Sequence, residues 1–195
     1  MPQPIAVRMQ TFIPKTGHVG GEPSGAVWRS YPISTTAMWW ILDAVGGHML
    51  AALCRFARSG TGVDLSHNSI AFAKRHFPNQ TFFAEDILSF SKRKRCFDFV
   101  FSSELLEHLR SPDDFMTTLR AITRPNALVY LSAPDAGHRA TPSDLATWPD
   151  ICPPEHLQWF NETNLAMLFD QNGFVPFKRH RTKTPAHSVF FRRVF

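Results

Sequence analysis

The chain has few cysteines, and they form no recognisable pattern. Its 195 residues contain three of them, Cys54, Cys96 and Cys152, which are widely separated. There is no CxxC pair and no His/Cys cluster with metal-ligand spacing, so we predict neither a structural zinc site nor any other metal centre. Isolated thiols are typical of a reducing compartment, and we expect a cytoplasmic protein.

Long hydrophobic runs are also absent. No apolar stretch reaches the roughly 18 residues that a transmembrane helix needs, so we expect no membrane span. The first residues lack the charged-then-apolar pattern of a secretory signal. No internal repeat and no low-complexity tract is visible.

A strong charge excess is missing as well. The formal net charge is +5, and the Lys and Arg residues are scattered apart from residues 92–95 and the tail. No aromatic residues are interleaved with residues 92–95, as they would be in a surface that stacks nucleic-acid bases. We therefore predict a solvated loop there and expect no nucleic-acid partner.

The composition divides the chain into two parts. Residues 1–35 are rich in Pro, Gly and Ser and show no sustained apolar period. Such a segment cannot bury enough surface to offset its ordering entropy, so we predict an N-terminal arm. Residues 36–195 contain regular apolar runs and are long enough for one domain with a substantial core.

Short apolar runs alternate with amphipathic stretches along this predicted domain. One strand carries Val63 and ends at Asp64; the other strands are predicted at residues 37–43, 80–84, 97–102, 127–132, 174–177 and 188–191. Helices are predicted at residues 49–57, 67–77, 112–123 and 162–172, the first ended by Ser59 and Gly60 and the second capped by Ser66. Strand–helix–strand units require a parallel sheet. The fold predicted is α/β, a doubly wound, mostly parallel, Rossmann-like sheet with an antiparallel C-terminal strand.

Polar residues stand at the carboxyl ends of several predicted strands. They are Asp43, Asp64, Asp86 and Ser102. Ligands of doubly wound sheets bind at this edge, and a carboxylate there can accept hydrogen bonds from two ribose hydroxyls. Asp and Ser before a helix are also common N-caps, so Asp64 taken alone allows either interpretation.

Several stretches carry a pattern that is specific in its order and spacing. They are residues 62–66 (GVDLS), 84–87 (AEDI), 97–109 (FDFVFSSELLEHL), 131–134 (LSAP) and 153–160 (PPEHLQWF), followed by Gly173 and Phe174. Together they resemble the class I S-adenosylmethionine-dependent methyltransferase family, particularly its small-molecule group similar to ubiquinone-biosynthesis enzymes. The resemblance implies S-adenosyl-L-methionine as the cofactor and a small molecule as the methyl acceptor.

The resemblance also implies roles for individual residues. Asp64 would bind the ribose hydroxyls, Asp86 would contact the adenine amine, and Ile87 would pack beside the adenine ring. Ser102 and Ser103 would face the methionine end of the cofactor. Leu65, Glu107 and His108 are expected to line the same pocket.

The first family motif is altered in this chain. Residues 42–48 read LDAVGGH, where the family has an acidic residue followed by three alternating glycines. Asp43, Gly46 and Gly47 remain its candidate cofactor ligands. A catalytically impaired or non-catalytic binding protein on the same fold therefore stays open as a second function. A nicotinamide-dependent oxidoreductase is a distant third, because no GxGxxG follows the first strand.

Two histidines are candidate bases for an acceptor hydroxyl. Residues 135–154 form a long connection that we expect to be a lid or a substrate wall, and it ends in two prolines. His156, shortly after these prolines, is the first candidate. His108, in the predicted helical turn after the fourth strand, is the second. Each also has a structural interpretation, in which His156 holds the loop against the domain and His108 makes a local hydrogen bond.

Overall fold

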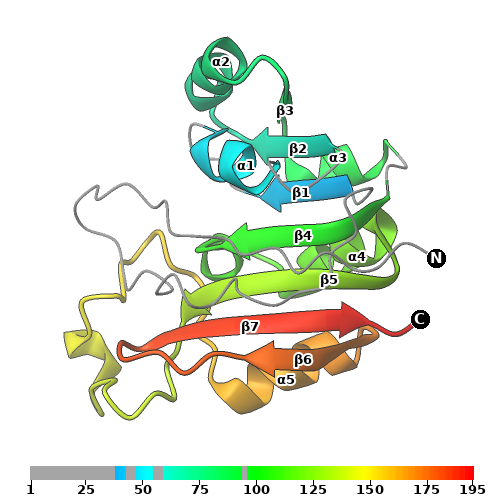
Figure 1. Cartoon of the computed structure of the whole chain (residues 1–195). Helices are drawn as coiled ribbons and strands as arrows, with labels where there is room; N and C mark the ends of the chain where they lie inside the picture. The colour runs from blue at the N-terminus through cyan, green and yellow to red at the C-terminus, as the bar shows by residue number, and fades with distance from the viewer. Residues whose placement is uncertain (1–37, 43–46, 55–58, 94–95) are drawn as a thin grey trace.

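A single sheet organises the protein (Figure 1). The computed structural model describes residues 38–42, 47–54, 59–93 and 96–195. Within them, seven strands have the order β3-β2-β1-β4-β5-β7-β6. The strands are β1 (Met38–Leu42), β2 (Ser59–Asp64), β3 (Thr81–Ala84), β4 (Phe97–Ser103), β5 (Thr123–Pro134), β6 (Phe174–Arg179) and β7 (Ala186–Arg193). The helices are α1 (His48–Leu53), α2 (His67–His76), α3 (Ile87–Ser91), α4 (Pro112–Ile122) and α5 (Glu162–Asp170), with 3₁₀ turns η3 (Leu106–His108) and η4 (Leu145–Thr147).

Strand direction confirms the predicted fold class. Strands β3, β2, β1, β4 and β5 are parallel, and β7 is antiparallel to both β5 and β6. The chain builds outward from β1 to β3, crosses back to β4 and continues to β5. The strand order therefore reverses between the neighbours β1 and β4, which is where sheets of this kind bind ligands.

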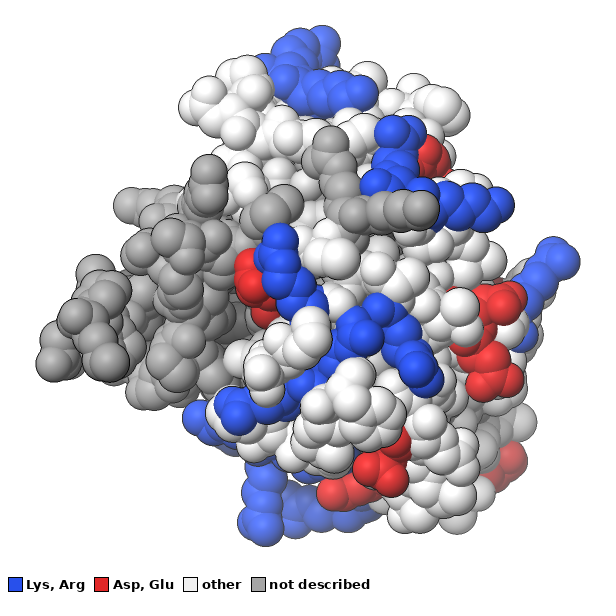
Figure 2. Space-filling view, turned by 90° about the vertical axis from the view of Figure 1, so that its right-hand side faces the viewer, with Lys and Arg blue, Asp and Glu red and all other residues white. Residues whose placement is uncertain are grey.

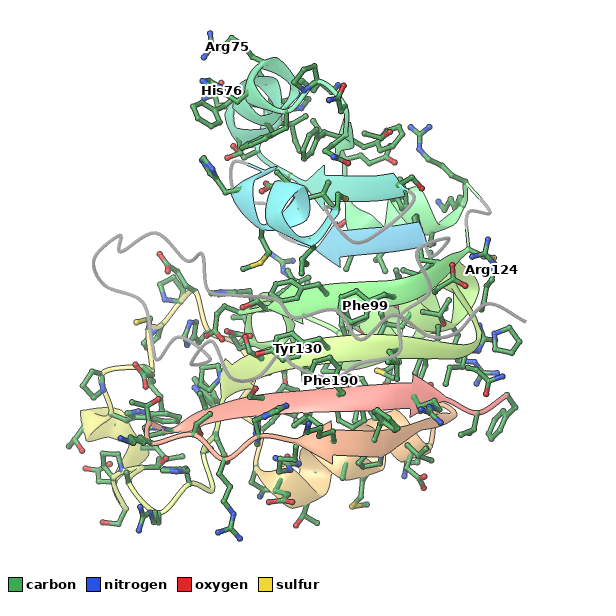
Figure 3. All side chains as sticks on the ribbon, viewed as in Figure 1. Arg75, His76, Phe99, Arg124, Tyr130 and Phe190 are labelled. Carbon is green, nitrogen blue, oxygen red and sulfur yellow. The ribbon has the colours of Figure 1, made fainter. Side chains whose placement is uncertain are left out.

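Helices cover both faces of the sheet, and successive residues of a strand point to opposite faces, apart from the irregularity between Phe97 and Phe99 in β4. In β4, Phe97 and Val100 pack into one buried cluster, which includes residues of α3, α4 and α5. Phe99 and Phe101 pack into the other cluster, which includes residues of α1 and α2. Figure 3 labels three members of that second cluster, Phe99 of β4, Tyr130 of β5 and Phe190 of β7, and the Phe190 ring lies near both of the others. Burial on both sides explains why β4 is a continuous apolar run.

Polar side chains bind the backbone at the ends of several helices. The Ser66 hydroxyl accepts from the Ser69 amide at 3.1 Å, which confirms the predicted cap of α2. Asn161 and Asn164 form a reciprocal capping box at the start of α5. At the end of α4, the Arg193 guanidinium donates to the Arg120 carbonyl at 2.8 Å.

The predicted end of the first helix is wrong. Ser59 and Gly60 are the first residues of β2, paired with β1. A Cβ atom on Gly60 would lie 2.0 Å from Cys54 Sγ and 2.7 Å from Leu50 Cδ1. Gly60 is thus required because α1 lies too close to the strand for a side chain at this position. The sequence alone does not distinguish such a glycine from one that ends a helix.

The fifth strand is longer than predicted. It spans Thr123–Pro134 instead of residues 127–132, and its pairing with β4 shifts register between Phe97 and Phe99. Asn126 within it has φ 66°, so the strand continues through a backbone irregularity. In the sequence, the Pro and Asn at this place are typical of a turn. The predicted N-terminal arm, residues 1–35, lies outside the described residues.

The surface carries charges of both signs. On the face in Figure 2, groups of Lys and Arg side chains are separated by acidic and uncharged ones. In the basic run, Arg93 is exposed and its Nε donates to Glu85 Oε1 at 2.7 Å, a bond that lowers the pKa of Glu85. Among the described residues, no helix is both long and apolar enough to cross a membrane.

Candidate functional site

Two carboxylates lie at the carboxyl ends of the adjacent strands β2 and β3. Asp64 pairs with Ala84 in the parallel register, and Asp86 follows two residues later. Asp64 Oδ1 accepts from the Ser66 amide at 2.7 Å. Asp86 Oδ1 accepts from the Leu88 and Ser89 amides at 2.8 and 3.2 Å and caps α3. Each carboxylate thus uses one oxygen to hold its own turn.

The apolar neighbours of these carboxylates differ in exposure. Leu65, directly after Asp64, is 71% exposed, whereas Ile87, directly after Asp86, is 9% exposed and belongs to the core cluster with Val63. Leu65 is therefore accessible to a ligand at this edge, and Ile87 offers it only a small part of its surface.

The described part of the altered first motif begins at Gly47, because Asp43 and Gly46 lie outside the described residues. Gly47 is the N-cap of α1 and has φ 80°, a conformation that favours glycine. A Cβ atom there would lie 2.9 Å from Ala73 Cβ and from Phe82 Cζ. Packing and backbone conformation alone therefore account for this glycine.

Ser102 lies at the strand-order reversal. It pairs with Leu42, the last residue of β1, and is fully buried. Its hydroxyl has no hydrogen-bond partner among the described residues. A buried hydroxyl without a partner is uncommon, and it indicates a position where a bound molecule can complete the hydrogen bonding.

A chain of side-chain hydrogen bonds joins the ends of β4 and β5. Ser132 Oγ donates to Glu104 Oε1 at 2.8 Å and lies 2.7 Å from Ser103 Oγ. Because Ser132 has only one hydroxyl proton, Ser103 must be the donor in the second bond. Ser103 is thus already engaged, unlike Ser102.

Glu104 has an unusual backbone conformation. Its φ is 51°, in the left-handed region that costs a residue with a side chain roughly 1–2 kcal/mol. Its amide donates to the Ser132 carbonyl at 3.0 Å, which fixes the turn after β4. Burial raises the pKa of the nearby Tyr130 to about 12, and the negative charge of Glu104 acts in the same direction. Backbone strain of this kind clusters at functional sites.

Side chains from two distant parts of the sequence meet beyond β4. Glu107, His108 and His156 each offer a ligand atom, and these atoms lie within 4.8 Å of one another. Glu107 is 1% exposed, with Oε1 4.0 Å from His108 Nε2. The rings of His108 and His156 meet edge to face with centroids 4.7 Å apart. The two histidine candidates predicted from the sequence are thus neighbours.

Hydrogen bonds hold this cluster together. His108 Nδ1 lies 3.0 Å from the Glu155 carbonyl, so it is the protonated nitrogen and Nε2 is left facing Glu107. The Glu107 carbonyl accepts from the Leu157 amide at 2.7 Å and from the Gln158 amide at 3.1 Å. The backbone on either side of His156 is therefore docked onto η3.

The cluster has two chemical uses. A neutral imidazole can accept a proton from an acceptor hydroxyl. His156 Nδ1 is buried and makes no hydrogen bond within the described part of the chain, so one ring nitrogen is not committed to the fold. One carboxylate oxygen and two imidazole nitrogens are also a donor set for divalent cations such as Mn²⁺ or Zn²⁺. No metal centre was predicted from the sequence, since His156 is far along the chain from Glu107 and His108.

A sequence model of a protein family, described as a methyltransferase domain, matches residues 44–177 of this chain. The chain belongs to this family. The resemblance to class I S-adenosylmethionine-dependent methyltransferases, predicted from the motifs at the ends of β2, β3 and β4, is thereby confirmed.

Curated methyltransferases share part of the sequence. A ubiquinone biosynthesis O-methyltransferase of Coxiella burnetii is 29% identical over 99 residues, which are 49% of this chain and 42% of that protein. The match thus spans less than half of the length of that methyltransferase.

Solved methyltransferases share the fold. An S-adenosylmethionine-dependent methyltransferase from Mesorhizobium loti has a TM-score of 0.68 at 16% identity, covering 81% of this chain and 91% of that one. Magnesium protoporphyrin IX methyltransferase from Synechocystis, solved with bound S-adenosylhomocysteine, has a TM-score of 0.64 at 16% identity, covering 81% of this chain and 74% of that one.

Glu104 and Ser132 of this methyltransferase chain, which the structure joins to Ser103, were not among the candidates predicted from the sequence. Both lie inside stretches that carry the family pattern, FDFVFSSELLEHL and LSAP, so a signal was present. Their pairing depends on the parallel register of Ser103 with Ser132, which becomes visible only once β4 and β5 are side by side.

Proposed function

We propose that this protein transfers a methyl group from S-adenosyl-L-methionine to an oxygen of a small-molecule acceptor. The proposal is supported by two groups of residues that follow the carboxyl ends of the parallel strands in a member of a methyltransferase family. Asp64, Asp86 and Ser102 suit a nucleoside cofactor, and the cluster of His108 and His156 suits an acceptor hydroxyl.

The carboxylates bind the adenosine part. Each has Oδ1 in use and makes no hydrogen bond through Oδ2 within the described residues. Asp64 Oδ2 accepts from the ribose hydroxyls and Asp86 Oδ2 from the adenine amine, with Leu65 and Ile87 beside the base. Oriented carboxylates at adjacent strand ends support this assignment.

The methionine part lies toward β1 and β4. Ser102 offers its buried hydroxyl, and Ser103 stands beside it at the strand end. Asp43, Gly46 and Gly47 of the altered motif complete this end by resemblance to the family.

Residues 36–195 form the methyltransferase domain and residues 1–35 an arm.

The acceptor lies against Glu107, His108 and His156. In the transfer, the acceptor oxygen bonds to the methyl carbon as the sulfonium carbon–sulfur bond breaks, and the acceptor proton passes to a base. His156 takes that proton, since its Nδ1 is not engaged within the described residues. His108 and Glu107 orient it. The name of the Coxiella relative supports oxygen as the methylated atom.

The same donor set supports a second use of the cluster, as ligands of a divalent cation that binds the acceptor oxygen. The two uses give opposite results when metal ions are removed. The free thiols Cys54, Cys96 and Cys152 support a cytoplasmic location.

Binding of S-adenosylhomocysteine, measured by calorimetry on the full chain, tests the cofactor assignment. Micromolar affinity is expected; no binding at millimolar product would refute it and favour a non-catalytic protein on this fold. Activity is then followed as conversion of the cofactor with a panel of small phenols.

Replacing His156 tests the acceptor side. We expect His156→Ala to lower kcat about 10²–10⁴-fold, the usual contribution of a general base, with product affinity unchanged. His138→Ala, in the same connecting stretch but outside the cluster, is the matched control. Activity that persists in EDTA supports the base, whereas activity lost in EDTA and restored by Mn²⁺ supports the cation. Turnover of His156→Ala equal to that of the parent at every pH would eliminate the base role.

A further inference from the structure

The connecting segment, residues 136–159, leaves the sheet and returns to it at one point. Asp135, after β5, forms a parallel bridge with Phe160, before α5. The Ala136 amide donates to the Phe160 carbonyl at 2.8 Å, and the Asp135 amide donates to the Pro185 carbonyl at 3.1 Å. Asp135 and Phe160 therefore form a neck through which both ends of the connecting segment pass.

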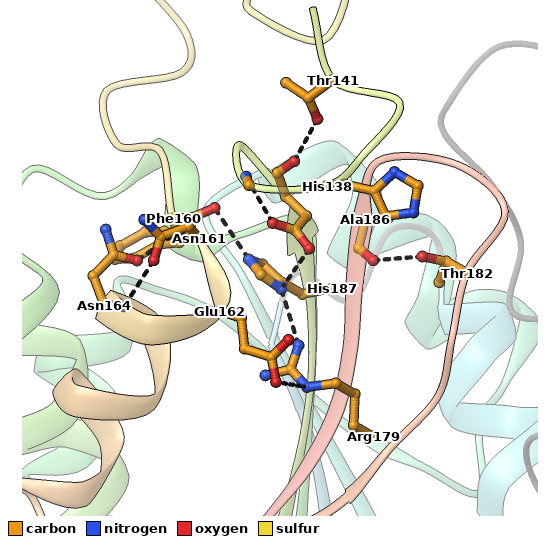
Figure 4. Close-up of polar contacts among 12 residues, drawn as sticks. His138, Thr141, Phe160, Asn161, Glu162, Asn164, Arg179, Thr182, Ala186 and His187 are labelled. Carbon is orange, nitrogen blue, oxygen red and sulfur yellow. Dashed lines mark hydrogen bonds and ion pairs between the residues drawn. The ribbon is translucent and has the colours of Figure 1, made fainter. Parts of the chain in front are cut away.

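His187 lies directly against this neck (Figure 4). It belongs to β7, opposite Ala133, and its side chain is fully buried. Its Nε2 is 3.1 Å from the Phe160 carbonyl. Its Nδ1 is 3.5 Å from Asp135 Oδ2 and 3.4 Å from Arg179 Nη1.

These contacts determine where the proton sits. A carbonyl only accepts hydrogen bonds, so Nε2 must carry the proton and donate it to Phe160. In the neutral ring Nδ1 is then an acceptor, and Arg179 is the donor that faces it. Arg179 is itself held by Glu162 of α5, with Nε to Oε1 at 3.1 Å. The neutral form of His187 thus links β7, β6 and the neck.

A second proton on His187 changes this balance. The added positive charge would be attracted by Asp135 and repelled by Arg179. The charged groups that face the ring are these two and Glu162, from the residue after β5, from β6 and from α5. Burial lowers the pKa of His187, against the opposing effects of Asp135 and the Phe160 hydrogen bond. Opening the neck would return the ring to water and to its ordinary pKa of 6.5. The open form binds the proton more tightly, so a fall in pH below 6.5 favours opening.

The neck holds the two ends of the connecting segment, which extends to the proposed acceptor site. The connecting segment carries His156, and the Leu157 amide is bound to the Glu107 carbonyl at 2.7 Å. Among the described residues, no hydrogen bond, ion pair or ring contact joins His187 to His108 or His156, so any effect it has on them passes through the connecting segment.

We propose that His187 is a positioning residue that joins the two ends of the connecting segment by donating a hydrogen bond from Nε2 to the Phe160 carbonyl. The Nε2 bond to Phe160 exists in both protonation states, but burial of the ring and Arg179 beside Nδ1 disfavour the second proton in the closed neck. Acid therefore shifts the equilibrium toward the open neck, and the acceptor side becomes less ordered. The effect of this opening on catalysis rests on the proposed function, but the hydrogen bonding of His187 at the neck does not.

Hydrogen exchange of backbone amides on the full chain tests the proposal without cofactor or turnover. At pH 7 we expect protection factors within residues 136–159 to fall about tenfold in His187→Met, which removes the donor at similar volume. His187→Gln retains an N–H donor at a similar reach and should stay close to the parent protein. In the parent, the same amides should lose protection by up to about tenfold between pH 6.5 and 5.5.

The pH response distinguishes positioning from packing. It should be absent in His187→Gln, whose amide does not titrate, and retained in His76→Gln, which replaces an exposed histidine of α2. Amides of β4 report global unfolding and should keep their protection. The proposal is overturned if His187→Gln keeps the parent's pH response, or if His187→Met keeps the parent's protection in residues 136–159. Failure of cofactor binding would refute the proposed function and leave this result unaffected.

Discussion

Replacing Asp64 separates the structural from the binding role of one carboxylate. Oδ1 accepts from the Ser66 amide at 2.7 Å, and Oδ2 is assigned to the ribose. Asp64→Asn keeps an oxygen for the Ser66 amide, because the amide side chain orients its oxygen toward that donor. It presents NH₂ in place of Oδ2 and loses the negative charge. Asp64→Ala loses both functions.

The magnitudes follow from the two bonds. Hydrogen bonds to a charged acceptor contribute about 1.5–3 kcal/mol, so Asp64→Asn should weaken binding of S-adenosylhomocysteine about 10- to 150-fold. Its melting temperature should stay within about 1 °C of the parent, because the Ser66 bond is retained. Asp64→Ala should weaken binding at least as much and also lose about 1 kcal/mol of folding free energy, or about 2–4 °C in a chain of this length.

Calorimetry of product binding and thermal unfolding provide the two measurements. Asp113→Asn, an exposed carboxylate in the first turn of α4, is the control for removing one negative charge and should change neither quantity by much. The reasoning fails if Asp64→Asn binds the product like the parent, or if it loses as much thermal stability as Asp64→Ala.

Two further predictions concern stability and reactivity. Gly47→Ala places a Cβ at φ 80° and 2.9 Å from Ala73 Cβ, so the free energy of unfolding should fall by about 2–4 kcal/mol in chemical denaturation; an unchanged midpoint would contradict the assigned packing. Burial raises the pKa of Cys54 to about 11, so at pH 8 iodoacetamide should label it about 100-fold more slowly than the exposed Cys152, with the difference shrinking as pH approaches 11; equal rates by mass spectrometry would count against this burial.

Much of the fold can be predicted from the sequence because its signals are local. The caps Ser66 and Asn161 bond to amides three residues away, and the apolar run of β4 reflects burial on both faces. The prediction failed at Gly60, where the absence of a side chain serves a contact with Cys54 across the α1–β2 unit. A glycine that ends a helix and a glycine beneath a helix look alike in a sequence.

Some of the residues discussed above were recognisable from the local sequence, and others only from contacts between distant parts of the chain. Asp64 and Asp86 could be predicted because each lies at the end of its own strand, Asp64 as the last residue of β2 and Asp86 two residues after β3. His187 could not, because its partners Asp135 and Phe160 are distant in sequence and the ring is recognisable only from its contacts with them. The meeting of His108 with His156 likewise depends on how the connecting segment folds back onto η3.

The attachment of the connecting segment to the Glu107 carbonyl has a consequence for redesign. Leu157 and Gln158 are held there through their amide groups, bonds that every amino acid except proline can make. Libraries that vary both side chains should therefore preserve the anchorage while altering the surface beside the proposed acceptor site, which makes this pair a starting point for engineering acceptor preference.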